Sequence, residues 1–258
     1  MSQYSLPSQE HMDFLWLIRK HEIDIALKYL PPTSKEQNLK LLELGAGTGQ
    51  QAHYLSNLGY RVLALDVPSS SYKEARIFPI TEYNGEEIPA ADEEFDLIFS
   101  SNVLEHVVNI DKTLSETHRT LKYGGTAIHI IPSPKCRIWS FPAHYIWLSK
   151  RIWKKSGLGK FSKASAAPKI PNSTKDWLRT IFPFVHGERG NALTEIYYFS
   201  TIYWKNLFEK NGFTIEKIYD NGIFYTMSNA FGTSISVKNR KRLSKFLGSS
   251  CIIYIVKK

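Results

Sequence analysis

The sequence predicts an α/β fold in which a mostly parallel sheet carries helices on both faces. Short apolar strands alternate with segments of helical periodicity along most of the chain, which is typical of strand–helix–strand units. A glycine-rich turn, Gly45–Gly49, directly follows the first strand. With 258 residues, of which 43% are hydrophobic, the chain can bury one sizeable core. This composition excludes a disordered, collagen-like or disulfide-stabilised protein.

Hydrophobic periodicity and stop signals place each element in order. The predicted strands are residues 39–44, 61–65, 95–100, 126–131, 214–219 and 251–256. The predicted helices are residues 9–30, 50–58, 110–121 and 201–210. Pro31 and Pro32 end the first helix, and a glycine follows each of the others. Strands that are joined through helices pair in parallel, so most of the sheet is expected to be parallel.

Two connections are longer than this alternation requires. Residues 133–198 separate the strand at 126–131 from its next helix, and residues 220–250 separate the last two strands. Long connections in an α/β domain are often lids or substrate-binding structure. We therefore expect one domain formed by residues 1–132 and 199–258, and an inserted basic, aromatic lid over residues 133–198. Within the lid, residues 143–155 predict an amphipathic helix.

The glycine-rich turn has the features of a ligand-binding loop. Gly45, Gly47 and Gly49 alternate along it, and glycines allow both a tight turn and close approach of a ligand to the backbone. Glu43 precedes the turn, where its carboxylate can orient the loop or accept a hydrogen bond from a ligand amine. Asp66 ends the second strand, where it can accept hydrogen bonds from both hydroxyls of a ribose.

Five sequence motifs together resemble class I S-adenosylmethionine-dependent methyltransferases of the type 11, ubiquinone-pathway-like group. They are Glu43–Gly49, Ala64–Asp66, Ile88–Pro89 with Glu94–Ile98, Asn102–Val107 and Leu121–Gly125. The glycine spacing differs from the dinucleotide fingerprint, where two residues separate the last two glycines. In Leu121–Gly125, Tyr123 replaces the proline that is usual in the family.

The resemblance implies a Rossmann-like sheet of seven strands, with the last strand antiparallel and the lid inserted after strand five. It implies S-adenosylmethionine as cofactor, lying across the carboxyl ends of the strands. Asn84 is expected near the adenine, which its carbonyl oxygen could bind, and Ser101 and Asn102 under the methionine part. The implied cofactor-binding residues are Glu43, Gly45, Ala46, Gly47, Gly49, Asp66, Val67, Asn84, Gly85, Ser101 and Asn102.

Candidates for proton transfer follow the fourth strand and recur in the lid. Glu105 and His106 are expected beside the reacting methyl group, and His186 lies in a segment that could cover the site. Part of the family binds a divalent metal through a Glu-x-x-Glu-His motif. Here Asn102 replaces the first glutamate, so a hard cation would lose an anionic ligand, and we expect no metal site.

The net charge of +9 is unevenly distributed along the chain. Between Thr117 and Lys175 there are 12 lysines or arginines and no acid, and a second basic cluster lies at residues 238–245. These segments could be solvated faces, or could contact an anionic membrane, an acidic small molecule or RNA. Within this sequence no recognised RNA-binding module flanks the predicted catalytic region, so we do not expect a nucleic-acid partner.

The sequence therefore favours a methyltransferase that methylates an oxygen of a small-molecule, glycan or lipid-linked acceptor. The alternatives are a non-catalytic, cofactor-binding partner subunit and an RNA methyltransferase that uses the basic insertion. Two cysteines, no secretory signal and no long apolar run favour a cytoplasmic protein, with peripheral membrane contact left open. The oligomeric state has no sequence signal.

Overall fold

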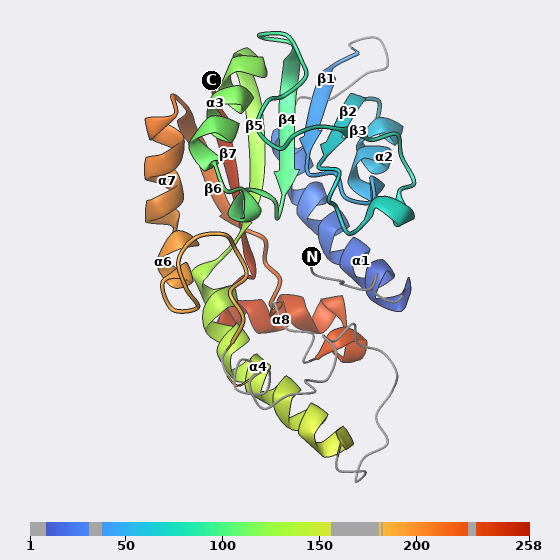
Figure 1. Ribbon diagram of the computed structural model, residues 1–258, viewed down its shortest axis with the longest axis vertical. Coiled ribbons are helices and arrows are strands. Elements are labelled where there is room, and N and C mark those ends of the chain that lie inside the picture. The colour runs from blue at the N-terminus through green and yellow to red at the C-terminus, as the bar shows by residue number, and fades with distance from the viewer. Residues whose placement is uncertain (1–8, 31–37, 156–180, 182, 227–230) are drawn as a thin grey trace.

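The chain folds around a seven-stranded sheet, as predicted (Figure 1). The computed structural model describes residues 9–30, 38–155, 181, 183–226 and 231–258. The strand order is β3-β2-β1-β4-β5-β7-β6, and only β7 runs antiparallel to its neighbours β5 and β6. The strands are β1 (Lys40–Leu44), β2 (Arg61–Asp66), β3 (Thr81–Glu82), β4 (Phe95–Ser101), β5 (Leu121–Pro132), β6 (Thr214–Asp220) and β7 (Cys251–Lys257).

Helices cover both faces of the sheet, which confirms the predicted α/β layers. On one face, α1 (Gln9–Ala26) and α2 (Gln50–Asn57) pack on a core that includes Leu41, Leu97 and Ile253. On the other, α3 (Ile110–Thr120) and α7 (Thr201–Lys210) pack on a core that includes Leu42, Ile98 and Tyr254. Consecutive strand residues point to opposite faces, so neighbours such as Leu41 and Leu42 belong to different cores.

Three elements differ from the sequence prediction. β5 begins at Leu121 rather than at residue 126. It pairs with β4 at Leu121–Phe95 and again at Thr126–Leu97, and the two glycines lie in the irregular stretch between these pairs. The third strand is the two-residue β3, whereas the motif resemblance placed that region near Ile88–Pro89. The amphipathic helix predicted at residues 143–155 begins nine residues earlier, as α4 (Pro134–Lys155), with Pro142 inside it.

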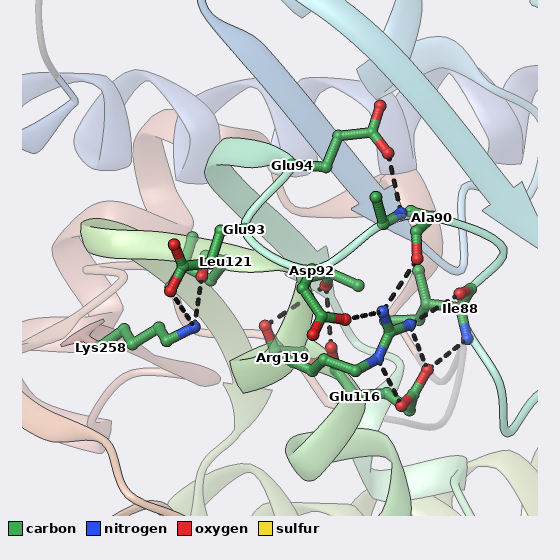
Figure 2. Close-up of polar contacts among 12 residues, drawn as sticks. Ile88, Ala90, Asp92, Glu93, Glu94, Glu116, Arg119, Leu121 and Lys258 are labelled. Carbon is green, nitrogen blue, oxygen red and sulfur yellow. Dashed lines mark hydrogen bonds and ion pairs between the residues drawn. The ribbon is translucent and has the colours of Figure 1, made fainter.

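A polar network around Arg119 holds the connection between β3 and β4 against α3 (Figure 2). The Arg119 guanidinium donates to the backbone oxygens of Ile88 and Ala90 and to the carboxylates of Asp92 and Glu116. Glu116 also accepts the Ile88 N–H at 3.0 Å. The contacts fix the end of the connection that begins at Tyr83, so they anchor a loop that reaches the carboxyl edge of the sheet.

The remaining described helices lie beyond the carboxyl ends of β4 and β5 or beside α7. These helices are α4, α6 (Glu195–Tyr198) and α8 (Val237–Leu247). Four 3₁₀ turns are distributed along the described chain: η1 (Leu27–Tyr29), η2 (Lys73–Ala75), η3 (Leu104–His106) and η4 (Gly232–Ser234). Figure 1 shows α4 and α8 side by side below the sheet. No helix in the described part of the chain is long and apolar enough to cross a membrane.

Candidate functional site

A cavity of about 690 Å³ opens at the carboxyl ends of β1, β2 and β4. This is the edge where open parallel sheets bind ligands. Its walls come from the turn after β1, the residues after β2, the connection after β3, the segment after β4, and α1. Of the sequence-predicted residues, it is lined by Gly45, Ala46, Gly47, Asp66, Val67, Asn84, Gly85, Ser101, Asn102 and His106.

The glycine-rich turn forms one wall of the cavity, and its backbone has left-handed dihedral angles that residues other than glycine adopt poorly. Gly45 and Gly47 have φ of +68° and +57°. A Cβ on Gly45 would lie 2.4 Å from a methyl carbon of Val103, so both its backbone angle and its surroundings require glycine. The Ala46 N–H donates to the Leu65 carbonyl at 2.9 Å, which joins the turn to β2. The turn therefore presents rigid, uncovered backbone to the cavity.

Asp66 carries an unused acceptor at the end of β2. Its Oδ1 accepts the Val67 N–H at 2.9 Å, which fixes the carboxylate. Its Oδ2 is buried and has no hydrogen-bond partner among the described residues. A buried acceptor without a partner is destabilising, so Asp66 Oδ2 is suited to a hydroxyl group from a ligand.

Two of the predicted cofactor-binding residues do not line the cavity. Glu43 lies behind the turn, where its Oε1 accepts from Gln51 Nε2 at 3.3 Å, and its burial raises its pKa to about 8. Gly49 is the N-cap of α2, with φ of +78°. The strand alternation and the turn direct both residues toward α2, so Glu43 is placed to orient the loop, and contact of either residue with a ligand stays a prediction.

The predicted adenine contact of Asn84 is also altered by the structure. Asn84 lines the cavity, but its Oδ1 already accepts the N–H groups of Glu86 and Glu87, at 2.9 and 2.8 Å. Asn84 therefore shapes its own loop with the oxygen that was expected to bind a ligand amine.

Asn102 has φ of +55° and donates its backbone N–H to the Ile130 carbonyl at 2.8 Å. Asparagine tolerates this left-handed backbone better than most residues.

The structure brings Glu105, His106 and His186 together, although His186 is 80 residues further along the chain. Glu105 Oε1 lies 3.8 Å from His106 Nε2 and 3.9 Å from His186 Nε2, and the two rings are 4.7 Å apart. The potential ligand atoms of the three residues all lie within 4.8 Å of one another, so a metal ion could fit between them. Only His106 of the three lines the cavity.

Burial sets the protonation of this cluster. Both Glu105 oxygens are buried without hydrogen-bond partners, and burial raises its pKa to about 8. Burial, with a smaller effect from His106, lowers the pKa of His186 to about 3, and burial also lowers the pKa of His106. At neutral pH, Glu105 therefore carries a proton while both imidazoles are neutral.

Hydrogen bonds of the side chains of Glu195 and Arg189 with backbone groups hold the segment around His186 against η3. Glu195, buried in α6, accepts the N–H groups of His186 and Gly187 at 2.7 and 2.6 Å and faces Arg137 Nε at 3.0 Å. Arg189 donates to the carbonyls of Leu104 and Val107, at 2.8 and 2.7 Å. Glu195 therefore positions the segment around His186.

Four residues of α1 line the cavity and were not predicted to do so: Met12, Leu15, Trp16 and Arg19. Arg19 NH1 donates to Glu22 Oε2 at 2.8 Å. The available signal was the placement of Trp16 and Arg19 one turn apart on one helix face. His144 of α4 is buried against Trp147 and Phe184, which is a packing role.

Residues 42–129 match a family model described as "Methyltransferase domain". The chain is 32% identical over 114 residues to an uncharacterized protein of Methanocaldococcus jannaschii, covering 43% of this chain and 51% of that protein. It is 23% identical over 201 residues to a ubiquinone biosynthesis O-methyltransferase of Bartonella quintana, covering 75% of this chain and 66% of that protein. The chain thus spans between about half and two thirds of these two relatives.

Solved structures share the fold at low sequence identity. An S-adenosylmethionine-dependent methyltransferase from Mesorhizobium loti superposes with a TM-score of 0.55 at 16% identity, over 92% of this chain and 98% of that chain. A Haloferax volcanii complex of the Trm112 methyltransferase activator with its putative methyltransferase gives 0.56 at 14% identity, over 92% and 88%. These likenesses support the Rossmann-like assignment of the sheet and its helices.

Proposed function

We propose that the protein is an S-adenosylmethionine-dependent methyltransferase that methylates an oxygen of a small-molecule, glycan or lipid-linked acceptor. The match of residues 42–129 to a methyltransferase domain and the shared fold support this proposal. The observation that carries this proposal is the cavity at the carboxyl edge of the sheet. One wall of it is the glycine-rich turn, another holds the unused acceptor of Asp66, and His106 lines a third.

The residues around the cavity fit S-adenosylmethionine, the cofactor of this family. Asp66 Oδ2, buried and without a partner, would accept a ribose hydroxyl. Gly45 and Gly47, which both line the cavity, would present their backbone to the cofactor. Ser101 and Asn102 would lie on the methionine side, and Arg19 offers a positive charge from α1. When bound, the cofactor supplies a methyl group on a positively charged sulfur.

His106 is the proposed proton acceptor for the hydroxyl of the acceptor molecule. Its imidazole is neutral at neutral pH because burial lowers its pKa, so it has a lone pair available. The O–H proton would move to this imidazole as the oxygen forms its bond to the methyl carbon. Glu105, which retains its own proton, and His186 would hold the His106 ring in place from behind.

A binding and transfer experiment tests this function. Calorimetry should detect binding of S-adenosylmethionine and of its demethylated product, and failure of both to bind at millimolar concentration would refute the cofactor assignment. Cofactor with a labelled methyl group, incubated with fractionated extracts, should label a small-molecule, glycan or lipid fraction. Cofactor binding without any transfer would instead support the non-catalytic subunit, and labelled RNA would support the RNA methyltransferase.

A variant of His106 separates binding from proton transfer. His106→Ala should bind the demethylated cofactor nearly as well as the wild type but lose 10²-fold or more of its transfer rate, the usual order for a general base. Ser71→Ala, a polar change elsewhere on the cavity wall, serves as a control. Equal rates for His106→Ala and the wild type would remove His106 from this role.

A cytoplasmic location is part of the proposal. Cys136 and Cys251 are both free and buried, which suits a reducing compartment. Localisation of the tagged full-length chain by fractionation would test it.

A further inference from the structure

Two acid-free segments that are far apart in the sequence meet at one end of the molecule. α4 lies within Thr117–Lys175, and α8 lies after Asp220, beyond which the chain has no acid. Trp139 Nε1 in α4 donates to the Leu247 carbonyl at the end of α8, at 2.9 Å. Figure 1 shows both helices below the sheet, on the side to which β4 and β5 run. The fold therefore joins the two basic regions on the side where the cavity opens.

The exposed face of α8 is a stripe of four basic side chains, which we call the α8 basic face. Its members, at positions i, i+3, i+4 and i+7, are Lys238, Lys241, Arg242 and Lys245. Arg240 points the other way and is buried, donating to the carbonyls of Ile235 and Phe224 at 3.0 and 3.1 Å. Burial of Arg240 fixes the rotation of the helix, so the stripe is held toward solvent.

The α8 basic face differs from the surface around the sheet in having no counter-charges. None of its four side chains forms an ion pair with a residue in the described ranges. Around the sheet, by contrast, Lys40 pairs with Glu94 at 3.1 Å, Lys122 with Asp96 at 2.6 Å and Lys210 with Asp111 at 3.0 Å. The four charges of the α8 basic face therefore lie together without a neighbouring acid among the described residues, so their potentials add.

An exposed aromatic ring lies next to this charge in the sequence, and α4 carries further exposed apolar side chains. Phe246, next to Lys245, is 88% exposed. On α4, Ile138 and Tyr145 are each 48% exposed and Ile152 is 52% exposed. An aromatic ring beside lysines can enter the headgroup region of a bilayer while the ammonium groups contact anionic lipids. Binding through phosphate alone, as in a nucleic-acid site, would not require these exposed apolar side chains.

We propose that the α8 basic face, with Phe246, docks the protein on an anionic lipid membrane. The lysines and Arg242 supply the attraction to acidic headgroups, which reaches only about a Debye length, and Phe246 supplies shallow insertion. This docking turns the cavity side of the sheet toward the bilayer. It does not depend on the proposed methyl transfer, because none of these residues lines the cavity.

Sedimentation of the full-length protein with vesicles tests the proposal. Vesicles of phosphatidylcholine with about one third phosphatidylglycerol should pellet the protein at ~0.05 M salt and much less at ~0.5 M, because salt screens the attraction. Vesicles of phosphatidylcholine alone should bind at least tenfold more weakly. Equal binding to both compositions, or no binding to either, would overturn the proposal.

Charge-reversal variants assign the binding to α8. Lys241→Glu with Lys245→Glu should reduce binding to anionic vesicles at least tenfold, and Phe246→Ala should reduce it severalfold. Lys28→Glu with Lys205→Glu, a matched double reversal of exposed lysines elsewhere, should leave it unchanged. All variants should keep wild-type thermal unfolding and cofactor affinity, so a failed cofactor assignment would not affect this result. RNA binding that depends on Lys241 and Lys245, without vesicle binding, would contradict the membrane assignment.

Discussion

Replacing Asp66 with asparagine removes one acceptor from the cavity and changes little else. In the wild type, Oδ1 accepts the Val67 N–H at 2.9 Å, and the buried Oδ2 has no partner. The asparagine carbonyl can keep the contact with Val67. Its amide group then stands in place of Oδ2 and donates where a ribose hydroxyl needs an acceptor.

The expected loss is that of one charge-assisted hydrogen bond. Such bonds contribute about 1.5–3 kcal/mol, so Asp66→Asn should raise the Kd for the demethylated cofactor about 10- to 150-fold. Isothermal titration calorimetry measures this directly. Glu82→Gln is a matched control, because Glu82 pairs with Asp66 in register across β2 and β3 but does not line the cavity. A folded Asp66→Asn variant whose Kd stays within about threefold of the wild type would refute the reasoning.

Three further outcomes follow from contacts elsewhere. Arg119→Ala, which removes the network around the β3–β4 connection, should lower the free energy of unfolding by about 1–3 kcal/mol in denaturant melts. As a control, Lys210→Ala removes one exposed ion pair and should change the free energy of unfolding by at most about 1 kcal/mol. Equal effects of the two variants would contradict the structural role of Arg119. Chelation should leave methyl transfer unchanged, whereas a loss restored by Zn²⁺ or Mg²⁺ would assign Glu105, His106 and His186 as metal ligands. Burial raises the pKa of Glu105 from 4.5 to about 8, so between these pH values the folded chain keeps a proton that the unfolded chain releases. Glu105 therefore makes the free energy of unfolding decrease as the pH rises from about 4.5 to 8. Glu105→Gln should reduce the decrease of the free energy of unfolding between about pH 6.5 and 8. Below pH 6.5, His186 has the opposite effect, because its pKa is lower in the folded chain. If urea melts give the same pH dependence for the variant and the wild type, Glu105 is not buried and protonated.

The sheet was predictable because its strands carry a strong local signal. Buried parallel strands such as Leu39–Leu44 and Phe95–Ser100 are short, mostly apolar runs between turn signals. β3 was missed because its two exposed residues, Thr81 and Glu82, offer no apolar pattern. The early start of β5 was missed because Gly124 and Gly125, which usually end an element, lie here within an irregular stretch of strand pairing.

The candidate site was predictable only where its residues are close in sequence. The turn at Gly45–Gly47 and the acid Asp66 occupy fixed positions in one strand–helix–strand unit. The proximity of His186 to Glu105 depends on Glu195 and Arg137, which are buried against each other inside the lid. The contribution of α1 to the cavity depends on how that helix packs across the sheet edge. Neither is a local property of the sequence.

The position of β7 has a consequence for the order in which the protein can fold during its synthesis. β7 lies between β5 and β6 and pairs with both, so these two strands never touch each other directly. Until residues 251–257 have left the ribosome, β6 has no strand partner, and the edge of β5 stays open. The parallel part of the sheet can form earlier, because domains fold from the N-terminal side as they emerge. A nascent chain stalled before Cys251 should therefore hold an incomplete sheet with an unpaired edge, which is the kind of surface that chaperones bind and that aggregates.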